Sequence, residues 1–245
     1  TVLAAAAAAG AGRAVLVSSY TTLIAGRRHP SLAQVDESVD LAPEDLLGPY
    51  PRSKRRAELA ALEAALPTVI VQPSAPVGPG DWRPTPPGAL LADMANGRLP
   101  AMLDCSWNLV DVRAVADGVV AALARGRPGA RYLLSGENLD TEGVLARFEA
   151  ASGVAGPRMR VPYGVALAAA HVGEAVARVT GRPPQAPLTG VRLAGPRIAF
   201  DNAKARRELG FAPPPVDGAI RDALLWLRSV GRLERDLPGL DKLPA

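Results

Sequence analysis

Two short apolar runs, separated by one long helical pattern, most constrain the fold of this chain. The runs are RAVLVSS at 13–19 and PTVIVQP at 67–73, and the residues at 52–66 between them are strong helix formers. Continuous apolar runs of this length are typical of strands buried on both faces of a parallel sheet. Strand, helix and strand at this spacing predict a right-handed βαβ unit, and therefore an α/β fold.

The rest of the chain extends this pattern. A third apolar strand is expected at 131–136, and from about 157 onward helices alternate with proline-rich connections. The tail at 232–245 is weakly patterned, and we expect it to be disordered. The other expected elements are helices at about 89–97, 113–126, 141–153 and 216–231, with an extended segment at 107–112.

A tyrosine and a lysine stand four residues apart where the first long helix begins, in the stretch Gly48–Lys54. Because positions i and i+4 share a helix face, the side chains of Tyr50 and Lys54 are expected to point the same way. A tyrosine titrates near about 10 and is a poor proton shuttle at neutral pH, but a cation held close lowers its pKa. The pair is therefore either a general acid–base device or an ordinary helix start with Lys54 in solvent.

The charge pattern does not favour nucleic-acid binding. The net charge is +4, and the basic residues are scattered among acidic ones. The densest run, RSKRR at 52–56, lies on a helix that also carries Glu58 and Glu63. We interpret this helix as having a solvated charged face, and we expect no nucleic-acid partner.

Cysteine and histidine are too few for the usual metal and disulfide sites. Cys105 is the single cysteine, and His29 and His171 are the two histidines, so no metal site is expected. Neither histidine lies near Cys105 in the sequence, which argues against a cysteine nucleophile. A reducing, cytoplasmic compartment is the simplest interpretation.

The apolar run at 161–179 carries charged residues and does not predict a membrane span.

Five motifs occur in the order and spacing of a known family. They are Val17-Ser18-Ser19, the pair Tyr50 and Lys54, QPSAPVGPGD at 72–81, NLVDVRAVADG at 108–118 and FDNAKARRELGF at 200–211. Together they resemble the extended short-chain dehydrogenase/reductase family of nucleotide-sugar epimerases, dehydratases and dihydroflavonol-type reductases. The loop that begins at Gln72 is most similar to the hopanoid-associated sugar epimerase and dihydroflavonol-reductase-like branch.

The resemblance implies a role for each matching residue. Tyr50 would exchange a proton with a carbinol or carbonyl oxygen, Lys54 would lower its pKa and bind the nicotinamide ribose, and Ser19 would hold the same oxygen. Ser18 would replace Ser19 if the alignment slips by one residue. The implied cofactor is NAD or NADP. The residues implied to contact it are Tyr50, Lys54, Pro73, Ser74, Ala75 and Pro76, and those implied to bind substrate are Asp81, Arg83 and Asn108.

One departure from the family pattern is large. The family opens with a strand and a G-x-x-G-x-x-G loop, which places the cofactor pyrophosphate on a helix N-terminus. This sequence contains no such loop, and its glycines at 10 and 12 follow a polyalanine helix. We therefore expect an N-terminally truncated chain that holds the last three strands of the family's sheet. As an isolated fragment it is expected to bind NAD(P) weakly and to be inactive.

The expected architecture is the C-terminal part of a Rossmann-type doubly wound parallel sheet with a smaller, mostly helical substrate domain. The sheet domain is expected at 1–156, where the loop at 73–112 contributes to the substrate site, and the helical domain at 157–231. The expected function is an NAD(P)-dependent oxidoreductase or epimerase for a nucleotide-sugar or similar small molecule, homodimeric at full length. A non-catalytic binding or regulatory relative, or a decayed gene product, is the alternative.

Overall fold

The computed structural model describes residues 2–25, 34–181, 188–194 and 198–241. The chain forms two compact units, and each unit draws on three separate stretches of sequence. The domain boundary expected at residue 156 divides the chain into continuous segments, which is a different division from these units. That boundary stays a prediction. The first unit contains 1–75, 113–136 and 198–214, and the second contains 76–112, 137–197 and 215–245.

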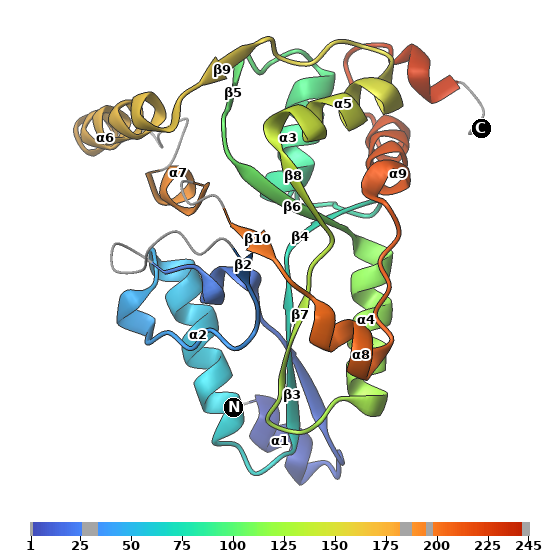
Figure 1. Ribbon diagram of the computed structural model, residues 1–245. Helices are drawn as coiled ribbons and strands as arrows, with labels where there is room; N and C mark the ends of the chain where they lie inside the picture. Colours follow the sequence, from blue (N-terminus) through green and yellow to red (C-terminus); the bar gives the residue numbers. More distant parts are fainter. Residues whose placement is uncertain (1, 26–33, 182–187, 195–197, 242–245) are drawn as a thin grey trace. The chain divides into compact units, whose positions relative to one another are not determined.

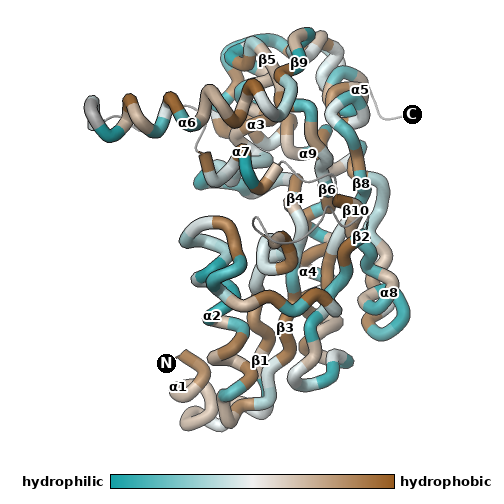
Figure 2. The backbone as a smooth tube through the Cα atoms, turned by 60° about the vertical axis from the view of Figure 1, so that its left-hand side comes forward, coloured by the Kyte–Doolittle hydropathy of each residue, from teal (hydrophilic) through white to brown (hydrophobic). Residues whose placement is uncertain are grey.

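A three-stranded parallel sheet forms the centre of the first unit. Its strands are β1 (Ala14–Val17), β3 (Thr68–Pro73) and β7 (Arg131–Leu134), in the order β1-β3-β7. The central strand β3 is buried along its whole length, and its hydrophobic colouring stands out in Figure 2. In the described part of the chain, β3 is the one sheet neighbour of β1, and Val17 is 43% exposed. The predicted parallel α/β core is confirmed.

Two helices, α2 (Pro49–Leu62) and α4 (Val112–Arg125), lie on opposite faces of this sheet (Figure 1). Gln72 of β3 donates a hydrogen bond to α2, whereas Val69 of the same strand lies against Gly126 at the end of α4. Positions 69 and 72 point to opposite sides of a strand, because side chains alternate along it. The remaining elements of this unit are α1 (Val2–Ala8), η1 (Tyr20–Leu23), β2 (Gln34–Val35), η2 (Pro43–Asp45), β10 (Ala199–Phe200) and α8 (Ala203–Leu209).

The second unit packs helices against short strands. Helix α9 (Val216–Ser229) is its clearest amphipathic element, because positions 216, 219, 220, 223, 224 and 227 are buried at helical spacing. Strand β6 (Ser106–Asp111) pairs antiparallel with β8 (Glu137–Asp140), and β5 (Ala101–Leu103) pairs parallel with β9 (Met159–Val161). The other elements are β4 (Ala75–Val77), α3 (Pro86–Ala95), α5 (Thr141–Ser152), α6 (Tyr163–Thr180) and α7 (Leu188–Ala194).

The described part of the tail is ordered, which corrects the expectation of disorder from residue 232 onward. A short 3-10 helix, η3, spans Pro238–Asp241, and Leu237 and Leu240 are 1% and 3% exposed. Arg221 of α9 also donates a hydrogen bond of 3.1 Å to the carbonyl oxygen of Leu240. Two isolated leucines form no periodic pattern from which this packing could be predicted. Burying each of them stabilises the folded segment by about 1.5–3 kcal/mol.

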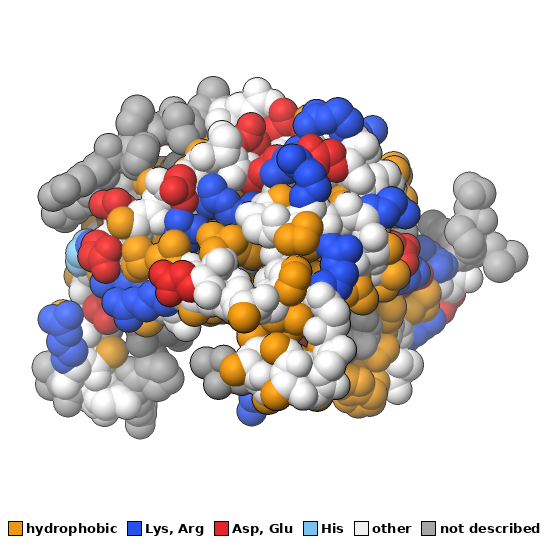
Figure 3. All heavy atoms as spheres, turned by 90° about the horizontal axis from the view of Figure 1, so that it is seen from below, with side chains coloured by type: hydrophobic (Ala, Val, Ile, Leu, Met, Phe, Trp, Pro, Cys, Tyr) orange, Lys and Arg blue, Asp and Glu red, His pale blue; other side chains and the backbone are white. Residues whose placement is uncertain are grey.

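The charges of the described surface are mixed. On the face shown in Figure 3, blue basic and red acidic side chains are interspersed with orange hydrophobic ones and form no stripe of one sign. A single-sign stripe is the usual footprint of nucleic-acid binding. Across the described stretches, no helix combines the length and the apolar character that a bilayer crossing requires.

Candidate active site

The two serines at the end of β1 have different surroundings. The Ser18 hydroxyl donates a hydrogen bond of 2.5 Å to Oε1 of Glu58. The Ser19 hydroxyl caps η1, where it accepts hydrogen bonds from the backbone N–H and the hydroxyl of Thr21, at 3.3 and 3.0 Å. In both of these contacts Ser19 is the acceptor, so its own proton stays available for another oxygen.

Tyr50 and Lys54 lie on one face of α2, as the spacing predicts. The helix begins at Pro49, three residues earlier than expected, so Tyr50 lies within its first turn; it ends at Leu62. The Lys54 ammonium lies 5.9 Å from the centre of the Tyr50 ring and donates a hydrogen bond of 3.1 Å to the Val17 carbonyl oxygen. Tyr50 is 54% exposed. The lysine is therefore held between the tyrosine and the carboxyl end of β1.

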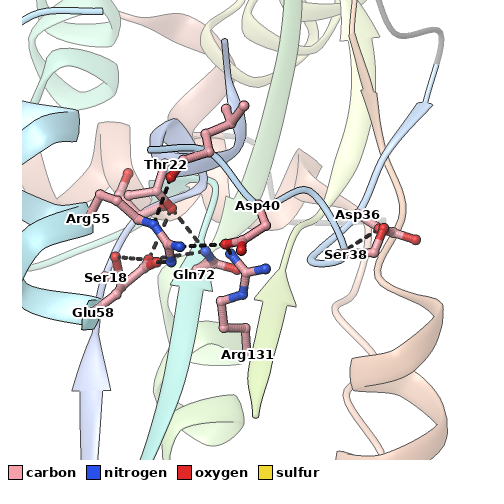
Figure 4. A network of polar contacts seen from close by, with 11 residues as sticks. Ser18, Thr22, Asp36, Ser38, Asp40, Arg55, Glu58, Gln72 and Arg131 are labelled. Atoms are coloured by element: carbon pink, nitrogen blue, oxygen red, sulfur yellow. Dashed lines mark hydrogen bonds and ion pairs between the residues drawn. The ribbon is translucent and has the colours of Figure 1, made fainter. Parts of the chain in front are cut away.

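Part of the charged run on α2 is buried, which corrects our interpretation of a solvated face. Arg55 is 5% exposed and Glu58 is fully buried, and the two form an ion pair of 3.0 Å. Arg52 and Arg56 on the same helix are exposed. A buried ion pair requires further hydrogen-bonding partners, which sequence spacing alone does not reveal. Figure 4 shows those partners converging from neighbouring elements.

The segment expected to line the cofactor follows β3 directly. Pro73 is the last residue of that strand, and the backbone N–H of Ser74 donates to Leu134 of β7 at 3.2 Å. The Ser74 hydroxyl is buried and has no hydrogen-bond partner among the described residues. Ser135, which follows β7, has a second buried hydroxyl in the same condition. Unpartnered buried hydroxyls are costly, and these two stand at the carboxyl edge of the sheet, where α/β folds bind ligands.

Ser135 was not among the residues predicted from sequence. Its signal is positional, because it directly follows the apolar strand at 131–134, as Ser18 and Ser74 directly follow theirs. The unpartnered hydroxyl of Ser74 fits a polar ligand group at this edge. The nicotinamide end of a dinucleotide has such groups, so the residues present fit that part of NAD or NADP.

The predicted substrate residues belong to the second unit, and two of them make local contacts. The Asp81 carboxylate accepts hydrogen bonds from the backbone N–H and the hydroxyl of Thr85, at 2.9 and 2.8 Å, where α3 begins. Asn108 is buried in β6 and donates to Asn138 of β8 at 2.8 Å. Arg83 is exposed. Asp81 and Asn108 therefore have structural uses, and their binding roles stay predictions.

A hollow of about 170 Å³ lies beside Asp81 within the second unit. The loop 76–81 forms one wall, and side chains of α3 and α9 form others. Most of its lining is apolar, with Asp81 and Thr85 as the polar groups at its edge. Such a hollow suits an apolar part of a small molecule. Its lining residues are Pro76, Val77, Gly78, Pro79, Gly80, Asp81, Thr85, Gly88, Leu91, Val112 and Ala223.

Cys105 is an inert buried thiol, consistent with the argument against a cysteine nucleophile. Burial raises the pKa of its thiol to about 11, and a hydrogen bond with Thr141 opposes this shift in part. Within the described residues, no three histidine, cysteine or acidic side chains gather as metal ligands. His29 lies outside the described residues.

The raised pKa of Cys105 predicts a pH-dependent stability. Above pH 9 the unfolded chain loses the thiol proton while the folded chain keeps it, so stability falls as pH rises from about 9 to 11. The loss attributable to this group reaches about 2–3 kcal/mol. Urea unfolding of the wild type and of Cys105→Ala across this range measures it as a difference. Parallel pH profiles for the two proteins would contradict the prediction.

The chain is similar in sequence to two reductases. It is 36% identical over 238 residues to a Synechocystis protein named as a putative dihydroflavonol 4-reductase, which covers 94% of this chain and 68% of that protein. It is 34% identical over 223 residues to a 4-hydroxy-2-methyl-3-oxo-4-farnesyl-3,4-dihydroquinoline-1-oxide ketoreductase of Stigmatella aurantiaca, covering 86% and 64%. No protein-family model matches the chain.

The fold is shared with a solved structure of moderate sequence similarity. A nucleoside-diphosphate-sugar epimerase from Pseudomonas aeruginosa superposes with a TM-score of 0.75 at 27% identity. The match covers 95% of this chain and 72% of that one. The chain therefore spans about two thirds to three quarters of the proteins to which it is similar here.

Proposed function

Because this chain belongs to the extended short-chain dehydrogenase/reductase family, we propose that it carries the acid–base half of an NAD(P)-dependent reductase or epimerase. The observation that carries the proposal is the arrangement at the end of β1. Lys54 donates a hydrogen bond there to the Val17 carbonyl oxygen and lies beside Tyr50 on the same helix face. In its contacts with Thr21, the Ser19 hydroxyl is the acceptor and does not use its own proton. The reaction acts on a carbinol or carbonyl group of a small substrate.

Each of the three residues has a defined role in the proposed mechanism. Tyr50 gives a proton to the substrate oxygen in reduction, or takes it in oxidation, as a general acid or base. Lys54 provides a positive charge beside that phenol and a donor for the cofactor ribose. Ser19 donates a hydrogen bond to the same substrate oxygen and fixes its position. The nicotinamide, when bound, supplies or accepts the hydride at the adjacent carbon.

The cofactor-lining segment is proposed to be Pro73, Ser74, Ala75 and Pro76. The unpartnered Ser74 hydroxyl supports this assignment. The sequence has no glycine-rich phosphate loop, so the 245-residue chain alone is proposed to bind NAD or NADP weakly. A homodimer at full length and a cytoplasmic location are further proposals, taken from the resemblance and from the lone Cys105.

The substrate class has two candidates. A nucleotide-sugar is one, on the resemblance and on the name of the Pseudomonas protein. The apolar hollow beside Asp81 favours a second, an apolar carbonyl compound, and the name of the Stigmatella protein describes a farnesyl-bearing substrate. Asp81, Arg83 and Asn108 are proposed to contact the substrate in either case.

Cofactor oxidation tests the proposal directly. The full-length protein should oxidise NADH or NADPH in the presence of a carbonyl substrate or epimerise a nucleotide-sugar. The 245-residue chain alone should show no submicromolar cofactor binding by calorimetry. Absence of turnover across both substrate classes would favour the non-catalytic alternative, and submicromolar binding by the chain alone would contradict the assignment of a missing phosphate site.

A further inference from the structure

A fully buried glutamate, Glu58, links α2 to the carboxyl end of β1 (Figure 4). Its Oε1 atom accepts hydrogen bonds from Ser18 at 2.5 Å and from the side-chain amide of Gln72 at 3.1 Å. The Thr22 hydroxyl lies 3.0 Å from the same oxygen, and Arg55 donates to Oε2 at 3.0 Å. These partners come from β1, β3, η1 and α2. One carboxylate therefore connects four elements of the first unit.

The same hydrogen bonds lead to the proposed catalytic residues. Tyr50, Lys54 and Glu58 stand at i, i+4 and i+8, so they share one face of α2. Lys54 donates a hydrogen bond of 3.1 Å to the Val17 carbonyl oxygen, and Glu58 accepts one from the hydroxyl of the next residue, Ser18. Successive turns of α2 therefore form hydrogen bonds with the last residue of β1 and with the residue that follows it.

The backbone of Ser19 contacts the same hydrogen-bond network through Thr22. The Thr22 hydroxyl lies 2.8 Å from the Ser19 carbonyl oxygen and 3.0 Å from Glu58, and its single proton serves one of the two at a time. It also accepts a hydrogen bond of 2.9 Å from Gln72. The backbone of Ser19 is thus placed by groups that Glu58 orients.

We propose that Glu58 is a positioning residue that sets the rotation and the axial register of α2 against β1, and so fixes Ser19, Tyr50 and Lys54 relative to one another. The inference rests on the proposed function of those three residues. Stability alone does not require this network, because apolar side chains of similar volume often replace a buried ion pair without loss. Fixed geometry does require it, because three directional donors, with Thr22 as a shared fourth, define a single position of the carboxylate. A shift of about 1 Å at reacting groups can reduce a rate about 10²-fold.

Glu58→Gln tests the inference, because the glutamine side chain has nearly the same shape as glutamate but carries no charge. The amide NH₂ group replaces an acceptor oxygen, so it must face a donor among Ser18, Gln72 and Arg55. We expect kcat to fall by about 10- to 100-fold while KM changes by less than about threefold, because orientation of bound substrate is lost rather than binding. Asp40→Asn is the matched control. Asp40 contacts the outer side of Arg55 but is 69% exposed in its side chain, and we expect kcat within about twofold of wild type.

Amide hydrogen exchange separates positioning from general loss of stability. In Glu58→Gln, peptides from 14–23 and 48–58 should exchange faster, while peptides from α9 in the second unit should be unchanged. Uniform acceleration throughout the chain would assign the network a purely structural role and overturn the inference. An unchanged kcat would also overturn it. If Glu58→Gln fails to fold, Ser18→Ala removes one partner and is judged by the same criteria, with a smaller loss of kcat expected.

The failure of the inference differs from the failure of the proposed function. If Tyr50→Phe keeps full turnover, the proposed chemistry is wrong, but the exchange pattern of Glu58→Gln still reports whether Glu58 holds α2. If Tyr50→Phe is inactive while Glu58→Gln has normal kcat and normal exchange, the chemistry stands and the positioning role is wrong.

Discussion

Replacing Tyr50 by phenylalanine is expected to lower kcat by about 10²- to 10⁴-fold, the usual contribution of a positioned general acid or base. Phenylalanine keeps the ring beside Lys54 but lacks the hydroxyl that exchanges a proton with the substrate. The Tyr50 side chain is 54% exposed, so its loss should not disturb the core. The measurement is steady-state turnover of the full-length protein.

A matched tyrosine controls for the substitution itself. Tyr163, the first residue of α6, lies in the second unit and has no proposed part in the reaction. Tyr163→Phe should keep kcat and KM within about twofold, as substitutions away from special features usually do. Both variants should match the wild type in circular dichroism and unfolding midpoint. Substantial turnover by Tyr50→Phe with a normal fold would show that Tyr50 is not the proton donor.

The sequence predicted the elements that periodicity and local geometry determine. The apolar runs at 13–19, 67–73 and 131–136 became β1, β3 and β7, because a strand buried on both faces leaves a continuous hydrophobic signal. The Tyr50 and Lys54 pair also lies as expected, because four-residue spacing on a helix fixes a shared face. Helix ends were less accurate, and α2 begins at Pro49 rather than near residue 52.

The polar network around Glu58 could not be predicted by the same means. Its partners Ser18, Thr22 and Gln72 are 40, 36 and 14 residues away along the chain, and no spacing rule connects them. A glutamate three residues after an arginine on a charged helix is typical of a solvated face, and that was our interpretation. The structure buries both residues because donors from three other elements satisfy the carboxylate.

The same contacts distinguish the two serines at the end of β1, which sequence left as alternatives. The Ser18 hydroxyl donates to Glu58, whereas the Ser19 hydroxyl accepts from Thr21 and keeps its proton. A serine that holds a substrate oxygen must donate to it. This difference supports Ser19 as the substrate-facing residue and Ser18 as a structural one. It combines a tertiary contact of Ser18 with a local capping contact of Ser19.

Removal of Arg55 is expected to give the largest loss of stability in this region. Arg55→Met should reduce the free energy of unfolding by about 3–5 kcal/mol, because it leaves the buried carboxylate of Glu58 without its cationic partner. It also removes donors to the Leu41 carbonyl at 2.9 Å and to Asp40. Methionine fills most of the volume of the arginine stem, so the loss reflects the uncompensated charge more than a cavity.

Arg52→Met on the same helix is the matched control for this prediction. Arg52 also donates from Nε to a loop carbonyl, that of Leu46 at 3.0 Å, but it is exposed and has no buried carboxylate as partner. Its replacement should cost less than about 1 kcal/mol. Urea unfolding of both variants, followed by circular dichroism, gives the comparison. Equal losses for the two arginines would mean that burial of Glu58 does not depend on Arg55, and that Ser18, Thr22 and Gln72 alone satisfy its carboxylate.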